Sequence, residues 1–545
     1  MRAASGRVAF PFLLFLAALS SAALASADDA LLENRLRAHV EFLASDELRG
    51  RQPGTVGYDI AARYVASQFA QMGLEPAGAQ GSYFQPVPLR RAVQVNGSAS
   101  MSLRRDGEVR DFRFVDEFYM GAQAAHAASA LEAEMVFAGY GIQAPELSYS
   151  DFKQLDMQGK IVVTLAGQPL DFPSEEGAHF GSSREKARAI TEHGGIGWVT
   201  VYTPRTQKRY AWERLRNRVG TPSMAWLGED GTPTMSFAQL EAGAQIHFEP
   251  AQALFAGAPH SLASLLAADE TGQGLPLFPL NGTLSIAQCS RHEEISSPNV
   301  VAVLPGSDPV LGSEYVVYVA HLDHIGELQG DGHDDAINNG ALDNASGISV
   351  MLETARLFAK SPQPRRSILF LAVTAEEKGL VGSEYYATHP TVPRDSMVGV
   401  INLDMPILLY DFADVIAFGA EHSTLQAAVR QAAAEFDTEL TLDPFPAQNI
   451  FVRSDHYRFV QQGIPSIFLV TGIRDRDAGI DAQPLFEAFL KDHYHQPSDD
   501  LALPINYAAG ARFTRINTRI GEILAGQSER PKWNEGDFFG DTFTP

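Results

Sequence analysis

The feature that most constrains the fold is the alternation of apolar runs with amphipathic segments after about residue 297. Runs such as EYVVYVAH and SILFLAVTA are rich in β-branched residues, and helical patterns such as SGISVMLETARLFAK separate them. Strands that are apolar on both faces and alternate with helices are typical of a mainly parallel sheet covered on both sides. The predicted fold class is therefore α/β, with a mainly parallel, mixed sheet sandwiched by helices. Functional side chains on such a sheet lie at the carboxyl ends of the strands.

The rest of the chain divides into further regions. Residues 1–27 place arginines ahead of an apolar run that ends in small residues, which is typical of a secretory signal peptide cleaved after Ala27. Residues 28–130 begin with two amphipathic helical patterns and are expected to form the N-terminal part of the main domain. Residues 131–285 contain several strand patterns and one helix, which predicts an inserted β-rich α/β domain, and residues 286–545 would form the rest of the main domain.

Charge and cysteine content narrow the partners and the compartment. The formal net charge of -24 argues against nucleic acid and anionic membrane surfaces as partners. Cys289 is the only cysteine, so neither an intramolecular disulfide nor a cysteine metal cluster can form. The N-terminal apolar run contains Pro11 and is short for a membrane span, so no stable anchor is expected after cleavage. We expect a bacterial protein exported to the periplasm or the medium.

Histidines and carboxylates follow several of the expected strands and loops. Each one alone is more often a cap or a turn residue, but their joint occurrence favours a metal site. The set comprises His321 in HLDH, Asp343 in ALDNASG, Glu377 in AEEKG, Asp404 in NLDM and His495 in YHQPSD. Two imidazoles and three carboxylates divide into one of each per ion plus one shared carboxylate, as a two-metal hydrolase requires. Such ligands suit two Zn²⁺ ions and would also accept Co²⁺ or Mn²⁺.

The ordered blocks HLDH, ALDNASG, AEEKGLVGSEYY, NLDM, SDHYRF with GIPS, and YHQPSD resemble a known family. This is the family of co-catalytic dizinc exopeptidases, which includes secreted bacterial aminopeptidases and the glutamate carboxypeptidase II type. The inserted domain resembles a protease-associated domain in its position and strand pattern. The resemblance implies peptide substrates and a zinc exopeptidase fold.

Carried over residue by residue, the resemblance also implies roles. His321 and Asp404 would bind one ion, Glu377 and His495 the other, and Asp343 both.

Three further residues match catalytic positions of the family. Glu376 matches the general base, and the charge repulsion between it and Glu377 is then compensated by a cation. Asp323 matches the acid that orients the His321 imidazole, and Tyr494 matches a tyrosine that donates to the tetrahedral oxyanion.

The expected reaction is hydrolysis of the N-terminal residue of a peptide by a metal-activated water, with a glutamate as general base. A carboxypeptidase of the glutamate carboxypeptidase type is the alternative; it would need a cationic pocket, and no arginine cluster that demands one is evident. A glutaminyl cyclase would use one metal. A non-catalytic binding module would lose ligands or the base, and here all of them are present.

Several neighbouring residues allow more than one interpretation. His324 and His493 lie close in sequence to the two candidate histidine ligands and could replace them. The segment Arg453 to His456 could contact the substrate or simply begin a helix with Asp455 near its cap. The loop GDGHDDAINNG is expected to be solvated, with a substrate-facing role or a second ion site as alternatives. Its ionisable residues are Asp331, His333, Asp334 and Asp335.

Overall fold

The computed structural model describes residues 28–153, 155–234, 237, 239–328 and 335–544. The predicted signal peptide and three ionisable residues of the loop GDGHDDAINNG, Asp331, His333 and Asp334, therefore lie outside the described residues. Within the described ranges, none of the helices has both the length and the apolar character needed to cross a membrane.

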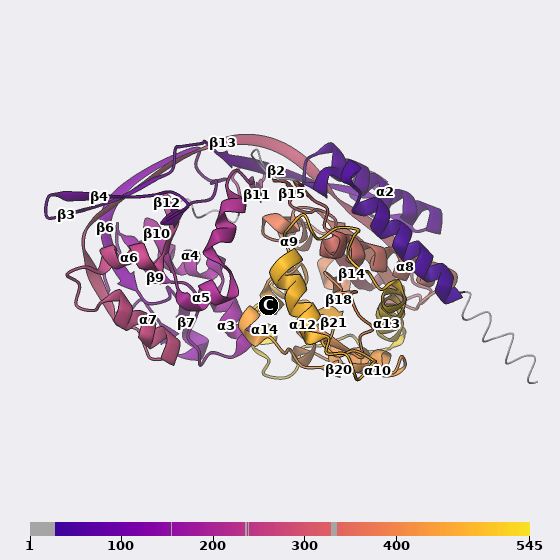
Figure 1. Ribbon diagram of the computed structural model, residues 1–545. Helices are drawn as coiled ribbons and strands as arrows, with labels where there is room; N and C mark the ends of the chain where they lie inside the picture. The colour runs from indigo at the N-terminus through magenta and orange to yellow at the C-terminus, as the bar shows by residue number, and fades with distance from the viewer. Residues whose placement is uncertain (1–27, 154, 235–236, 238, 329–334, 545) are drawn as a thin grey trace, which may run out of the picture.

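The main unit is built on a mixed sheet whose central strands run parallel (Figure 1). Parallel pairing joins β17 to β14, β14 to β18, and β18 to β21. The carboxyl ends of these four strands therefore meet at one edge. In order across the sheet, the strands are β11 (Ser223–Trp226), β2 (Phe84–Gln94), β13 (Leu277–Leu304), β17 (Ser367–Val373), β14 (Tyr315–His321), β18 (Met397–Leu403), β21 (Ser466–Thr471), β19 (Asp414–Phe418) and β20 (Glu439–Thr441).

Helices cover both faces of this sheet, which explains why its strands are apolar throughout. Successive residues of a strand point to opposite faces, and Tyr318 and Val319 accordingly belong to different apolar clusters. The helix over 28–43, α2 (Val56–Met72), α8 (Gly347–Lys360), α10 (Leu425–Ala434) and α13 (Tyr507–Gly526) cover one face, and α9 (Val381–Thr388) and α11 (His456–Val460) cover the other. The predicted α/β class is confirmed.

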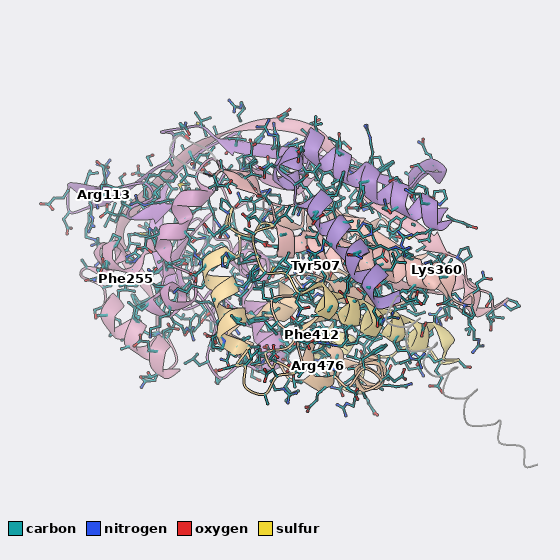
Figure 2. All side chains as sticks on the ribbon, turned by 45° about the vertical axis from the view of Figure 1, so that its right-hand side comes forward. Arg113, Phe255, Lys360, Phe412, Arg476 and Tyr507 are labelled. Carbon is teal, nitrogen blue, oxygen red and sulfur yellow. The ribbon has the colours of Figure 1, made fainter. Side chains whose placement is uncertain are left out.

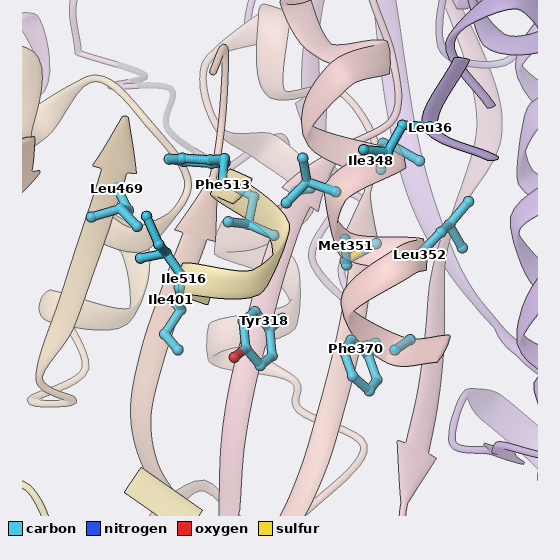
Figure 3. Close-up of a cluster of buried hydrophobic side chains, with 14 of the residues drawn as sticks. Leu36, Tyr318, Ile348, Met351, Leu352, Phe370, Ile401, Leu469, Phe513 and Ile516 are labelled. Atoms are coloured by element: carbon cyan, nitrogen blue, oxygen red, sulfur yellow. The ribbon is translucent and has the colours of Figure 1, made fainter. Parts of the chain in front are cut away.

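Figure 3 shows the larger of these clusters. The strand residues Tyr318, Phe370 and Ile401 lie beneath Met351 of α8 and Ile516 of α13. All five side chains are buried. Removing this much apolar surface from water fixes α8 and α13 on the sheet, and α8 begins just after the loop that carries Asp343.

The inserted unit has its own sheet and its own apolar core. The first half of β13 pairs with β3 and β6, and three consecutive parallel pairings join β6, β9, β10 and β12. The remaining strands are β4 and β5. Their bounds are β3 (Ser100–Arg105), β4 (Glu108–Phe112), β5 (Phe118–Tyr119), β6 (Ala128–Ala138), β9 (Ile161–Leu165), β10 (Gly197–Tyr202) and β12 (Ala242–His247).

The structure extends this unit beyond the boundaries expected from the sequence. Strands β3 to β5 lie before residue 131 but belong to the inserted sheet, because β3 pairs with β13, β4 pairs with β3 and β5 pairs with β12. At the other end, β13 continues without interruption from the inserted sheet into the main sheet (Figure 1). A single 28-residue strand therefore belongs to both units. In Figure 2, Arg113 and Phe255 mark the inserted unit, and Lys360, Phe412, Arg476 and Tyr507 mark the main unit.

The remaining elements are short. The inserted unit carries α3 (Ser174–Gly181), α4 (Ser183–Glu192), α5 (Pro204–Arg209), a 3-10 helix over Trp212–Arg218, α6 (Phe248–Ala251), α7 (Leu262–Thr271), and the pair β7 (Gln143–Ala144) and β8 (Tyr149–Ser150). The main unit adds β1 (Glu75–Pro76), β15 (Gly326–Glu327), β16 (Ile337–Asn338), α12 (Gln483–Ala488) and α14 (Phe538–Phe543). Helix α5 lies on the side of the inserted unit that faces α12 (Figure 1).

Candidate metal centre and its cavity

The candidate metal ligands gather at the carboxyl edge of the parallel strands. His321 is the last residue of β14, and Asp404 directly follows β18. Glu377 lies in the turn after β17, where Ala375 has a φ of 54°. Because β17, β14 and β18 are adjacent and parallel, their ends bring these three side chains together. The sheet topology therefore explains this part of the cluster.

Asp343 stands between the two histidines of the cluster. Its Oδ1 atom is 3.2 Å from His321 Nε2, and its Oδ2 atom is 3.3 Å from His495 Nε2. His321 Nε2 also lies 3.1 Å from Asp404 Oδ1, and His495 Nε2 lies 3.1 Å from Glu377 Oε2. Each oxygen of one carboxylate thus faces a different imidazole, and each imidazole has a second carboxylate of its own. This arrangement would allow Asp343 to be shared by two metal ions, each with one histidine and one further carboxylate of its own.

The donor set fits metal ions. Two groups that share Asp343 have ligand atoms within 4.8 Å of one another, namely His321 with Asp404, and His324 with Glu377. Buried ligand atoms such as Asp343 Oδ2 and Glu377 Oε1 have no hydrogen-bond partner in the described structure. Side chains that lie close together but do not form aligned hydrogen bonds are expected where they converge on a cation. The buried negative charge also needs a cation to balance it.

The pKa shifts of the clustered side chains also indicate that a cation would be favourable here. Burial alone would lower the pKa of His495, but the charges and hydrogen bonds of Glu377 and Asp343 raise it to about 10. Burial and the charge of Glu377 oppose ionisation of Asp343, yet the surrounding histidines hold the pKa of this carboxyl below its ordinary value. The cluster therefore favours positive charge between its carboxylates.

Comparison with known proteins agrees with this geometry. The model of peptidase family M28 matches residues 299–520, which include all five candidate ligands. Residues 299–520 are therefore similar to peptidase family M28. The family resemblance drawn from the sequence motifs is thereby confirmed for this part of the chain, and we call it the M28 segment.

The curated relatives match only in part. The chain is 29% identical over 212 residues to a probable leucine aminopeptidase 2 of Aspergillus oryzae, which is 37% of this chain and 40% of the relative. It is 37% identical over 119 residues to a probable zinc metalloprotease of Phaeosphaeria nodorum, which is 20% of this chain and 24% of the relative. The matches therefore span less than half the length of these relatives.

One solved structure extends the likeness beyond the M28 segment. An aminopeptidase from Aneurinibacillus sp. strain AM-1 aligns with a TM-score of 0.54 at 20% identity, covering 92% of this chain and 98% of that one. At this identity the comparison shows a shared fold. That fold includes the inserted unit, because the alignment covers nearly the whole chain.

Backbone hydrogen bonds fix the loop that carries Asp343. Asp499 accepts from the backbone N–H groups of Leu342 and Asp343, at 2.9 and 3.0 Å. From the other side, the buried Arg51 guanidinium donates to the carbonyl oxygens of Asn339 and Gly340, at 2.6 and 3.1 Å. Neither Asp499 nor Arg51 was among the site residues predicted from the sequence. The structure shows that both hold the candidate bridging ligand in place.

Asp323 acts through different atoms from those expected. The His321 imidazole interacts through Nδ1 with the backbone carbonyl oxygen of Asp323, at 3.1 Å. The Asp323 carboxylate instead accepts from the backbone N–H groups of Glu376 and Glu377, at 3.0 and 3.3 Å. The expectation that this carboxylate orients His321 is therefore revised, because its described hydrogen bonds hold the two glutamates.

Two residues near the cluster make contacts that the sequence did not predict. Ser454 donates its hydroxyl to Asp404 Oδ2 at 2.5 Å and accepts from Asn402, so it orients one candidate ligand. His324 is fully buried, and its Nδ1 atom lies 2.7 Å from Glu377 Oε1. The sequence signal for His324 was its spacing of three from His321, which suggested a substitute for that ligand. In the structure the two histidines occupy different halves of the cluster.

Other histidines considered from the sequence lie away from the cluster. His493 is half-buried near Ser498 and interacts with its hydroxyl at 3.0 Å. His456 is buried against the rings of Phe451 and Phe468, with ring centroids 5.3 and 5.5 Å apart. Burial lowers the pKa of His456 to about 3, so it is neutral and apolar in effect. Asp335, which belongs to the loop GDGHDDAINNG, is exposed.

A cavity of about 550 Å³ opens beside the cluster and is called the catalytic cavity here. Glu376 and Tyr494 line it, and the Tyr494 ring stacks on His495 with centroids 3.8 Å apart. Burial, with nearby carboxylates, raises the pKa of Glu376 well above its ordinary value, although His321 opposes this. On the far side, Gln207 and Tyr210 of the inserted unit complete the wall. The cavity therefore lies between the two units.

Proposed function

We propose that the protein is a dizinc aminopeptidase that hydrolyses the N-terminal residue of peptides. The observation that carries this proposal is that Asp343 directs one oxygen to His321 and the other to His495. With Asp404 and Glu377 as terminal ligands, these residues would hold two zinc ions. When bound, the ions supply Lewis acidity and lower the pKa of a water molecule.

Residues of the chain would then move the protons. Glu376 lines the catalytic cavity beside the candidate ligands. In this role it accepts a proton from the attacking water and passes it to the leaving amine. Tyr494 lines the same cavity and stacks on His495. Its hydroxyl would donate to the oxyanion as the carbonyl carbon becomes tetrahedral.

The cavity wall supports a preference for apolar first residues. A large apolar surface lies next to the metal cluster, and burying a side chain such as leucine against it would stabilise the bound substrate. The wall includes Phe418, Phe445, Phe468, Val470 and Phe486. The name of the Aspergillus relative, a probable leucine aminopeptidase, agrees with this preference.

The proposal also covers export of the protein and the role of the inserted unit. The sequence of residues 1–27 supports export after cleavage at Ala27. The position of the inserted unit, between two stretches of the main unit and against the catalytic cavity, supports a protease-associated domain that limits access to the site.

The test is metal content together with substrate direction. We expect two equivalents of zinc in the purified protein, hydrolysis of aminoacyl anilides with free amines, and no hydrolysis of N-blocked peptides with free carboxyl ends. Two equivalents with activity only on N-blocked peptides would instead identify a carboxypeptidase. One equivalent or none would overturn the two-metal mechanism.

A further inference from the structure

A second cavity lies on the inserted unit. It has a volume of about 650 Å³, and strands β10 and β12 form part of its wall. Its charged lining residues are Lys186, Arg209, Arg218 and Arg453. No aspartate or glutamate lines it among the described residues, although the whole chain carries 66 acidic and 42 basic residues. We call it the basic cavity, and its charge is opposite to that of the protein.

The basic cavity adjoins the catalytic cavity. Arg209, Tyr210 and Arg453 line both. Burial raises the pKa of Tyr210, but the charges of Arg218, His495 and Arg453 outweigh it and lower the pKa below its ordinary value. Tyr210 therefore lies in the wall that the two cavities share.

Among the described residues, the charges of Arg218 and Arg453 are not balanced by ion pairs with carboxylates. Arg218 donates to the Tyr210 hydroxyl at 3.2 Å, and Arg453 donates to the Gln448 carbonyl oxygen at 3.3 Å. In the described part of the chain, neither arginine forms an ion pair with an acidic side chain. Arg209 and Arg453 line the same cavity, and burial together with the charge of Arg453 lowers the pKa of Arg209. A bound anion would relieve this repulsion.

The two cavities together impose a direction on a peptide. Carboxylates and the candidate zinc ligands lie at one end, and guanidinium groups lie at the other. Guanidinium groups match the geometry of a carboxylate and bind it through paired hydrogen bonds. We propose that the basic cavity binds the C-terminal carboxylate of the substrate, so that the enzyme prefers short peptides with a free C-terminus. This inference rests on the proposed aminopeptidase function.

The expectation that no arginine cluster demands a cationic pocket is revised by this cavity. Arg209 and Arg218 come from the inserted unit, and Arg453 comes from the main unit. Their proximity depends on how the two units dock.

The experiment compares matched peptides that differ only at the C-terminus. Leu-Gly-Gly and longer leucine peptides are supplied as free acids and as amides, and kcat/KM is measured for each with the zinc-loaded full chain. We expect the acid to be favoured about 10-fold for the best length, because charge-assisted hydrogen bonds form with only one of the two ends. The preference should fall for longer peptides, whose carboxylate extends past the cavity.

Variants test which residues cause the preference. Arg218→Gln and Arg453→Gln should each bring the ratio of acid to amide close to one. Arg216→Gln is the matched control, because Arg216 lies on the same 3-10 helix but outside the basic cavity and pairs with Asp116 at 2.7 Å. It should keep the ratio of the unmodified protein. Since each ratio is measured within one variant, a partial loss of folded protein does not change it.

The outcomes separate the inference from the proposed function. Equal rates on acids and amides, with normal hydrolysis of leucine anilide, would overturn the carboxylate site and leave the aminopeptidase intact. No hydrolysis of any free-amine substrate would overturn the proposed function itself. Inorganic phosphate should inhibit hydrolysis of the acid peptide by competition. If phosphate instead accelerates hydrolysis of the amides, the cavity serves a free anion, and the inference is wrong.

Discussion

The two walls of the catalytic cavity are built in different ways. On the main unit, His321 and Asp404 stand at the ends of buried parallel strands, where backbone pairing fixes their positions. On the inserted unit, Tyr210 and Arg218 stand on or beside short helices, and the described contacts to the other wall include one from Arg214 to the Lys491 carbonyl oxygen. Backbone pairing within the sheet therefore fixes the candidate metal ligands of the main unit. The positions of Tyr210 and Arg218 relative to those ligands depend instead on how the two units dock.

The sharpest test of the rigid wall is the removal of one proton acceptor. Glu376→Gln should retain both metal ions but lower kcat by about 10²- to 10⁴-fold, because only the proton transfer is lost. Metal analysis of the purified variant and anilide hydrolysis would measure both effects. Glu377→Gln is the matched control, since it should lose metal as well as activity. A near-normal rate for Glu376→Gln would show that the two adjacent glutamates have been assigned wrongly.

Arg51 donates hydrogen bonds to the loop that carries Asp343, on the main-unit side of the cavity. It is 1% exposed, and burial lowers the pKa of its guanidinium to about 10, although the surrounding carboxylates oppose this. Arg51→Met should lower the free energy of unfolding by about 3 to 5 kcal/mol, because buried carbonyl and carboxylate groups lose their cation. Urea denaturation would measure the change. Arg49→Met, in the same turn but exposed and paired with Glu327, should change stability little. Equal effects of both variants would contradict the proposed support.

The docking of the inserted unit should depend on pH. His422 of the main unit contacts Glu175 of α3, and its Nδ1 atom is 2.5 Å from Asp537. Burial opposes protonation, but these two carboxylates raise the pKa of His422 to about 9, compared with about 6.5 in an unfolded chain.

A raised pKa in the folded state sets the sign of this effect. The stabilisation is complete below about pH 6.5 and is lost as the pH rises through about 9, with a total of about 3 kcal/mol at most. Thermal unfolding of the native protein and of His422→Gln should therefore differ at pH 6 and converge above pH 9. His260→Gln, an exposed histidine of the inserted unit, serves as the control. A difference that does not vary with pH would contradict the role of His422.

Sequence patterns predicted the rigid wall better than the docked one. Apolar runs identify strands, and a histidine or acid after each run identifies the edge of the sheet, so His321 and Asp404 could be placed together. Arg51 could not be identified, because its partners are backbone carbonyl groups that have no sequence signature. Arg218 and Arg453 meet only through the docking of two units, which no local pattern encodes.

His324 was noticed in the sequence, but its position in the cluster was not predicted. The sequence offered it as a replacement for His321, but the structure places its Nδ1 atom 2.7 Å from Glu377 Oε1 and 3.9 Å from Asp343 Oδ2. It therefore lies beside the second ion position, either to orient Glu377 or to bind the ion itself. Substitution of residues that orient ligands typically weakens metal affinity by about 10- to 100-fold.

His324→Gln should accordingly weaken one zinc ion and leave the other unchanged, because His321 and Asp404 belong to the other half of the cluster. Competition with a chelator would measure the two affinities separately from activity. His493→Gln, at a histidine that contacts Ser498 and not the cluster, should leave both affinities as they are. If both ions weaken together, Asp343 transmits the change and the halves are not independent. If neither weakens, the burial of His324 beside Glu377 serves packing, and the cluster needs only the five ligands that the motifs identify.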